Sequence, residues 1–155
     1  MPAPRLKDFD YVGYAAYSIT ICCDFKRKFF ESDKVVQKCI SFLKECSDKY
    51  QFKIYLYTFM PNHLHLCVVG DSDNANLKKM IIVFKQKCSF WFKKECNLKL
   101  FQQGYYDHII RKEEGIGKVM NYIAYNPIRK NLCENYCDYK FTGSFEFELS
   151  ESFFY

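Results

Sequence analysis

Two of the chain's three histidines, His63 and His65, lie one residue apart in an otherwise apolar run. Leu64 and Leu66 alternate with them, which is the pattern of a half-buried β-strand. Because successive side chains of a strand point to opposite faces, both imidazoles point to the same face, about 6–7 Å apart. Two imidazoles on one rigid face can hold one metal ion or one phosphate group. The pair alone is therefore compatible with a metal or phosphate site, and a structural or surface pair of histidines is the alternative.

A tyrosine and an amide later in the chain would suit the same site. Tyr122 and Asn126 are four residues apart in a stretch with helical apolar spacing, so they lie on one ridge of a helix. We expect both to flank the buried stripe and Tyr125 to face solvent. A phenol has a pKa of about 10, so its attack on a phosphodiester needs help with the proton and the phosphate's charge. A divalent cation held by two imidazoles and an amide oxygen would supply that help.

The elements that must position these residues follow from the hydrophobic patterns. Strands are expected at 11–23, 52–59, 63–69 and 105–111, and helices at 33–46 (capped by Ser32 or Asp33), 74–95 and 113–126. The turn at 60–62 joins two strands into a hairpin, and Pro127 is expected to stop the last helix. This order predicts an α+β, ferredoxin-like split βαβ fold: an antiparallel sheet with two packing helices plus a C-terminal catalytic helix.

Composition narrows the class of protein. The 155 residues are 49% hydrophobic and 19% aromatic with a net charge of +5, which excludes global disorder and is compatible with a nucleic-acid partner. We expect one domain over 1–155, with a loose N-terminus at 1–10 and a C-terminal tail at 133–155. The nine cysteines are odd in number and include no C-x-x-C, which argues against disulfides and a zinc site. Cys39, Cys46, Cys67 and Cys88 stand at apolar-periodic positions, so we interpret them as small core residues in a reducing cytoplasm. No apolar run reaches transmembrane length, so we expect no membrane partner.

Three blocks of the sequence resemble a known family, the HUH single-strand DNA transposases with one catalytic tyrosine. Residues 60–66 are similar to the HUH motif (His, hydrophobic, His). Residues 122–132 resemble the Tyr-Ile-x-x-Asn-Pro-Val-Arg-Ala-Gly-Leu block of its REP-associated tyrosine transposase branch, within the IS200-like family. Residues 101–111 are similar to that branch's Trp-Gln-x-Gly-Phe-x-Asp-His-x-Ile-Arg segment. Asn131 replaces the usual Gly and Phe101 the usual Trp, and the resemblance covers most of 11–145.

The resemblance implies a ferredoxin-like HUH endonuclease that cleaves and rejoins single-stranded DNA near a hairpin. Carried over by position, Tyr122 is the nucleophile that forms a 5′-phosphotyrosine. His63 and His65 are metal ligands, Asn126 is the third ligand, and Mg²⁺ or Mn²⁺ is the expected ion. The expected partner is single-stranded or hairpin DNA, and the protein is expected in the cytoplasm, associated with the nucleoid when bound to DNA. A homodimer, with sites within one chain or shared between two, stays open.

Six further residues are expected to contact DNA: Lys85, Lys118, His108, Arg111, Arg129 and Lys130. A solvated surface role is the alternative for the basic residues, and a structural role for His108.

Other functions stay open beside the transposase. One is a domesticated DNA-hairpin-binding protein without catalysis, and another is an HUH replication or mobilisation nickase. A histidine-triad nucleotide hydrolase is disfavoured because Cys67 stands where that family has its third histidine. Tyr125 is the next candidate nucleophile.

Overall fold

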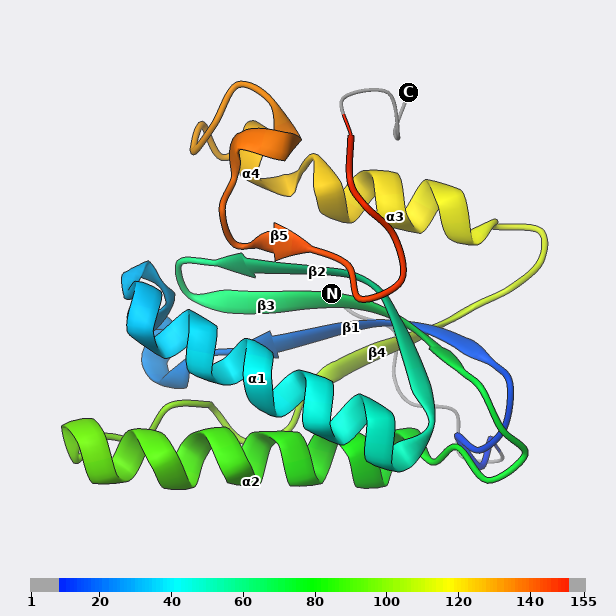
Figure 1. The fold of residues 1–155 in the computed structure, drawn as a ribbon, viewed down its shortest axis with the longest axis horizontal. Helices are drawn as coiled ribbons and strands as arrows, with labels where there is room; N and C mark the ends of the chain where they lie inside the picture. The colour runs from blue at the N-terminus through cyan, green and yellow to red at the C-terminus, as the bar shows by residue number, and fades with distance from the viewer. Residues whose placement is uncertain (1–8, 151–155) are drawn as a thin grey trace.

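The computed structural model describes residues 9–150 and forms a five-stranded antiparallel sheet with helices on both faces (Figure 1). The main elements are β1 (Ala16–Cys22), α1 (Asp33–Tyr50), β2 (Phe52–Met60), β3 (His63–Gly70), α2 (Leu77–Cys96), β4 (Tyr106–Ile110), α3 (Ile116–Ala124), α4 (Asn126–Arg129) and β5 (Thr142–Gly143). The strand order is β4-β1-β3-β2-β5, and every pairing is antiparallel. The α+β class and the split βαβ order are therefore confirmed.

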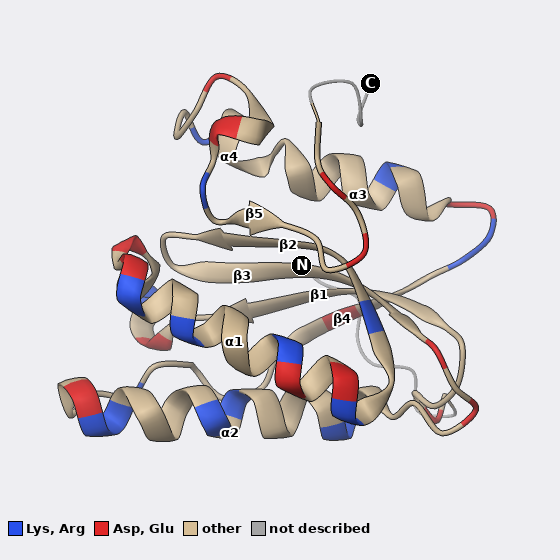
Figure 2. Ribbon diagram, in the orientation of Figure 1, with Lys and Arg blue, Asp and Glu red and all other residues tan. Residues whose placement is uncertain are grey.

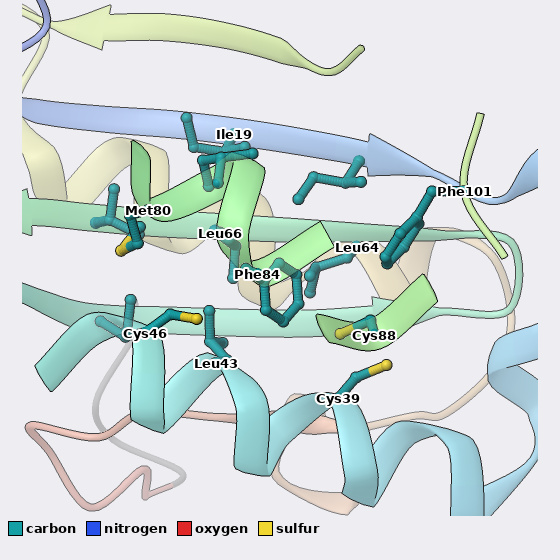
Figure 3. Close-up of a cluster of buried hydrophobic side chains, with 14 of the residues drawn as sticks. Ile19, Cys39, Leu43, Cys46, Leu64, Leu66, Met80, Phe84, Cys88 and Phe101 are labelled. Atoms are coloured by element: carbon teal, nitrogen blue, oxygen red, sulfur yellow. The ribbon is translucent and has the colours of Figure 1, made fainter. Parts of the chain in front are cut away.

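Helices α1 and α2 cover one face of the sheet because their apolar stripes meet the inward side chains of the strands. Figure 3 shows this core, which is built from Ile19, Leu64 and Leu66 of the sheet and from Cys39, Leu43, Cys46, Met80, Phe84 and Cys88 of the two helices. All nine cysteines are free. The expectation that Cys39, Cys46, Cys67 and Cys88 are core residues is confirmed, since all four are buried.

Helix α3 covers part of the opposite face. Met120, Ile123 and Ala124 pack there against Leu56 of β2 and Cys67 of β3. Side chains of β3 alternate faces, so His63 and His65 share this face with Cys67, beyond the area that α3 covers. The strand therefore directs its leucines to the main core and its histidines to the open end of the second face.

Several boundaries differ from the expected ones. The first strand begins at Ala16 instead of 11, because Tyr11 and Gly13 adopt left-handed φ angles of 60° and 102°. Helix α2 begins after Asn76, whose side chain accepts a hydrogen bond from the amide of Lys79. Helix α3 starts later and ends earlier than expected, and Pro127 lies in the first turn of α4 instead of stopping a helix.

The C-terminal part of the chain returns to the sheet. Residues Thr142–Gly143 pair with β2 as a fifth strand, which the sequence patterns did not predict. The Tyr139 hydroxyl donates a 2.7 Å hydrogen bond to the Phe59 carbonyl and fixes this return. The expected loose N-terminus falls largely on residues 1–8, outside the described part of the chain. Within residues 9–150, no helix has the length and apolar character needed to cross a bilayer.

Lys and Arg residues are spread over α1, α2 and the loops (Figure 2). Helices α1 and α2 lie on the face of the sheet opposite α3, and acidic residues are interspersed with the basic ones along α1 (Figure 2). The lysines of α2 are therefore on the other face from the histidine pair.

Candidate active site

The two histidines of β3 converge on one point. Their Nε2 atoms lie 3.0 Å apart, and their rings meet edge to face with centroids 4.6 Å apart. Asn62 Oδ1 lies 2.6 Å from His63 Nδ1, and Thr20 Oγ1 lies 3.1 Å from His65 Nδ1. When each Nδ1–H donates to its oxygen, the Nε2 lone pairs of both rings face the same point. Asn62 and Thr20 thus orient the pair as outer partners orient metal-binding histidines.

The spacing of the two nitrogens fits a divalent cation. Metal–nitrogen bonds of about 2.1 Å at right angles place two ligand nitrogens about 3.0 Å apart. In the described part of the chain, no third His, Cys, Asp or Glu joins the pair to form a larger metal-binding group. The remaining ligands must then be amide, hydroxyl, phosphate or water oxygens, which suit Mg²⁺ and Mn²⁺. Asn126, the predicted third ligand, carries such an amide and is 7% exposed at the start of α4, and its binding of a metal stays a prediction.

Both imidazoles are held in the neutral form that binds metals. Burial lowers the pKa of His65 to about 3, and the neighbouring His63 and Arg129 add to the shift. The pKa of His63 is also lowered, first by burial and then by the charges of Lys130 and Lys26. These charges show that Lys26 and the segment after α3 lie close to the pair. At neutral pH the pair therefore has no proton to lose before it binds a cation.

A cavity of about 460 Å³ opens above the histidines. Three of its lining residues are lysines: Lys26, Lys28 and Lys130. Thr20 and Cys22 of β1 and Leu132 complete much of the remaining wall. A positively charged cavity over two neutral imidazoles suits an anionic ligand that also contacts a cation, such as a phosphodiester.

The tyrosine ridge of α3 lies beside this cavity, not in it. Tyr122 is 62% exposed and lines a separate recess with Lys118, Asn121, Tyr125 and Arg129. Its ring centroid is 4.1 Å from the Arg129 guanidinium, which also donates a hydrogen bond to the Tyr122 carbonyl. The expectation that Tyr125 faces solvent is wrong. Its ring is half-buried and packs against Tyr136 at 5.6 Å, because the segment after α4 folds back over it.

Comparison with known proteins assigns the family. A family model described as "Transposase IS200 like" matches residues 11–126. The chain belongs to this family. Two proteins of Haemophilus influenzae are similar to this chain. One, an uncharacterized protein, is 27% identical over 86% of this chain and 92% of its own length. The other is provisionally named a REP-associated tyrosine transposase and is 22% identical over 86% of this chain and 82% of its own length.

Solved structures share the fold of this chain. A REP-associated tyrosine transposase bound to a REP hairpin superposes with a TM-score of 0.74 at 15% identity, covering 90% of this chain and 82% of that one. A protein from Deinococcus radiodurans, provisionally named a transposase, gives 0.55 at 12% identity, covering 83% of this chain and 98% of that one. These matches agree with the sequence resemblance to the REP-associated branch.

The six predicted DNA contacts of this chain fall in four places. Arg129 and Lys130 lie near the histidines, and Lys118 lies in the recess beside Tyr122. Lys85 donates hydrogen bonds to the carbonyls of Gln102 (3.0 Å) and Gly104, so its ammonium fixes the loop before β4. Contact of these residues with DNA stays a prediction.

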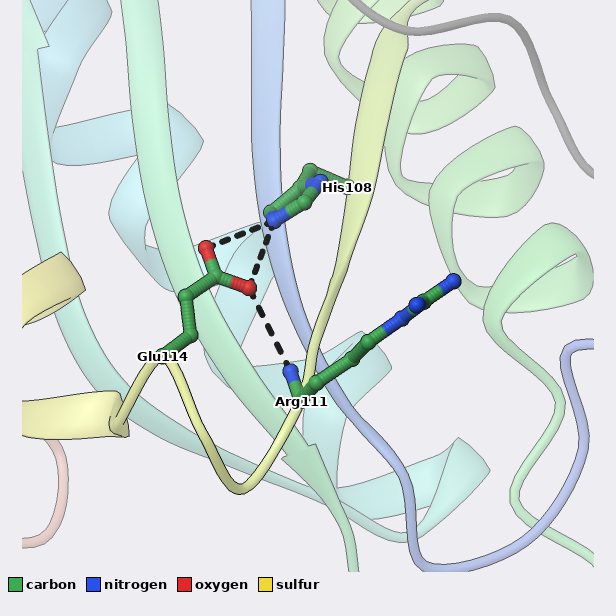
Figure 4. Close-up of polar contacts among 3 residues, drawn as sticks. All are labelled: His108, Arg111 and Glu114. Atoms are coloured by element: carbon green, nitrogen blue, oxygen red, sulfur yellow. Dashed lines mark hydrogen bonds and ion pairs between the residues drawn. The ribbon is translucent and has the colours of Figure 1, made fainter.

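His108 and Arg111 lie on the other side of β1 from the histidine pair, on and just after β4. Figure 4 shows His108 Nε2 between the two carboxylate oxygens of Glu114, at 2.7 and 2.8 Å, and the Arg111 amide directed at the same carboxylate. The hydrogen bond from His108 lowers the pKa of Glu114. This contact ties the end of β4 to the turn that leads into α3.

Sequence reasoning missed four residues of the site: Asn62, Thr20, Lys26 and Lys28. Asn62 stands directly before His63, so its position in the turn was a usable signal. Thr20 becomes the partner of His65 only through the register that pairs these two residues across β1 and β3, which no pattern within one strand reveals.

Proposed function

We propose that this protein is a transposase that cleaves single-stranded DNA near a hairpin and rejoins it through a 5′-phosphotyrosine at Tyr122. Mg²⁺ or Mn²⁺ would be held by His63, His65 and Asn126. The observation that carries the proposal is the 3.0 Å separation of the two Nε2 atoms beneath a cavity lined by lysines. The related structure solved with a REP hairpin supports a DNA hairpin as partner.

The chemistry of the residues accounts for both directions of the reaction. When bound, the cation supplies positive charge at the scissile phosphate and orients it. Lys130 and Lys26 would offset the remaining phosphate charge. The Tyr122 Oη gives up its proton and forms a bond to phosphorus, the bond from phosphorus to the 3′-oxygen breaks, and that oxygen leaves as a hydroxyl. Attack of a 3′-hydroxyl on the phosphotyrosine reverses these steps, so rejoining needs no nucleotide cofactor.

The proposal requires Tyr122 to leave its recess and reach the cavity. Its side chain is 62% exposed and contacts Arg129 through a cation–π interaction. Such a contact at an exposed site is worth about 0.5–1 kcal/mol, so the scissile phosphate can compete for the ring at small cost. Asn126 is buried at the start of α4, so the amide would keep its place while the ring moves.

The test is the formation of a covalent adduct. A hairpin oligonucleotide with single-stranded extensions is incubated with the protein and Mn²⁺, then resolved on a denaturing gel. Because the tyrosine retains the 5′-phosphate, a label on the 3′ end should shift with the protein and a label on the 5′ end should not. Tyr122→Phe should give no adduct, whereas Tyr125→Phe should give one. Binding of the hairpin without an adduct in any metal would instead favour a non-catalytic hairpin-binding protein.

A further inference from the structure

The loop 24–28, which follows β1, forms one wall of the histidine cavity and is fixed at both ends. The Cys23 amide donates to the Asn62 carbonyl at 2.9 Å, and the Phe30 amide donates to the Pro61 carbonyl at 3.0 Å. The Phe30 ring is buried against Phe59. Both anchors lie on the turn that also carries the partner of His63. The loop therefore keeps a fixed position relative to the histidine pair.

Two consecutive residues of this loop adopt the left-handed backbone conformation, which is unfavourable for residues other than glycine. Phe25 has φ 52° and Lys26 has φ 53°, and neither is glycine, asparagine or aspartate. The left-handed region is costly for residues with a bulky side chain, and such strain is concentrated at functional sites. Here the backbone directs the lysine into the cavity wall and leaves the phenylalanine outside.

The Phe25 side chain is 82% exposed, the largest value among the large hydrophobic residues of the described chain. The Arg27 guanidinium lies 5.5 Å from its ring centroid, and Lys26 and Lys28 line the cavity with His63. Asp24, the acidic residue of the loop, faces Lys99 at 3.9 Å. An exposed ring flanked by cations is the combination with which proteins bind single-stranded nucleic acid: the ring stacks on a base and the cations bind phosphates.

We propose that the loop 24–28 is a nucleotide-binding subsite, in which Phe25 stacks on a base next to the scissile phosphate while Lys26 and Lys28 bind the adjoining phosphates. This inference rests on the proposed single-stranded DNA substrate and adds to it the element that holds the strand. Stacking tolerates any base, since every base has a π-face. The loop therefore fixes the strand over the histidines without reading its sequence.

Two probes separate stacking from charge: a short oligothymidylate and an abasic oligonucleotide of the same length and charge. Binding is followed by fluorescence anisotropy at several salt concentrations. The wild type should prefer the oligothymidylate. Phe25→Leu should weaken oligothymidylate binding about 5- to 100-fold and leave abasic binding unchanged, whereas Phe25→Tyr should keep both affinities. Lys26→Gln should weaken binding of both probes and reduce the slope of log K against log salt by about 0.7.

Phe90→Leu is the matched control. Phe90 is also exposed (68%) and carries a cation, Lys94, 4.6 Å from its ring centroid, but it lies on α2 across the sheet. Its substitution should change neither affinity. Phe25→Gly controls for folding: glycine adopts positive φ without strain, so this variant should lose oligothymidylate affinity with an unchanged or higher urea midpoint.

The outcomes distinguish this subsite from the proposed function. Should Phe25→Leu match the wild type on both probes while the wild type still binds oligothymidylate, the subsite is overturned and the DNA substrate stands. Equal binding of the two probes by the wild type overturns the subsite as well. Failure of the wild type to bind either probe overturns the subsite, whereas the proposed function is overturned only when the hairpin oligonucleotide gives no adduct.

Discussion

The guanidinium of Arg129 lies 4.1 Å from the centre of the Tyr122 ring, and the same charge lowers the pKa of His65. Arg129 therefore lies within reach of both the candidate nucleophile and the candidate metal ligands. It lines the recess of α3, and its charge also acts on the histidine of the neighbouring cavity, which is lined by other residues.

Removal of the Arg129 charge should slow adduct formation. Arg129→Gln is expected to lower the rate at saturating DNA by about 10- to 100-fold, because a cation that stabilises the charge of the reacting phosphate is lost. Arg129→Lys should recover part of the rate, since it keeps the charge but not the planar stacking on Tyr122. Rapid-quench sampling of the labelled adduct measures both rates. Equal rates for Arg129→Gln and the wild type would remove Arg129 from the mechanism.

Metal binding should depend on two of the three histidines. His63→Ala and His65→Ala should abolish Mn²⁺ binding in calorimetric titration, and Asn62→Ala should weaken it by about 10- to 100-fold because His63 loses its orienting partner. His108→Ala is the control. Its imidazole is paired with Glu114 beyond β1, so Mn²⁺ affinity should not change. Retention of wild-type affinity in His65→Ala would place the metal elsewhere.

The arrangement of the fold and the direction of the histidines could be predicted from sequence, because alternation along 52–69 and the helical stripes fix which side chains face the core. The place of Tyr122 could not. The rotation of α3 is set by Met120, Ile123 and Ala124 packing on Leu56 and Cys67, contacts between segments far apart in sequence. The periodicity of apolar residues identifies the buried stripe of α3, but it does not show which segment of the chain lies beside each edge of that stripe.

Tyr125 and Asn131 show two other limits. Tyr125 is covered by Tyr136, from a tail whose patterns predicted little structure. Asn131 stands where the related branch has glycine, and its φ of 59° explains the exchange, since asparagine tolerates the left-handed region better than most residues. Asparagine in place of glycine at this position therefore preserves the left-handed backbone conformation.

Acid should destabilise the protein through His65. Its pKa is about 3 when folded and about 6.5 when unfolded, so between these values the unfolded chain binds more protons. The free energy of unfolding should be unaffected above pH 6.5 and fall as the pH is lowered toward 3, by roughly 2–4 kcal/mol from this residue. Urea unfolding in EDTA at pH 7 and pH 4.5 should show a smaller loss for His65→Gln. An equal loss in both proteins would contradict the assigned shift.

The site should be complete within one chain, because α3 packs on its own sheet and Lys130 lines the same chain's histidine cavity. A mixture of His63→Ala and Tyr122→Phe chains should therefore form no adduct. Recovery of activity in the mixture would mean that Tyr122 is supplied by a second copy. As a control, each variant is mixed with the wild-type protein. Adduct formation in these mixtures shows that the variant chains do not inhibit the wild-type chain.

The identity of the nucleophile is tested most directly by mass spectrometry of the adduct. Trypsin should release residues 119–129 as one peptide that contains both Tyr122 and Tyr125, and fragmentation of this peptide locates the attached nucleotide. We expect a 5′-phosphorylated nucleotide on Tyr122 in the presence of Mn²⁺ and none in EDTA. A nucleotide on Tyr125, or an adduct that forms equally well in EDTA, would contradict it.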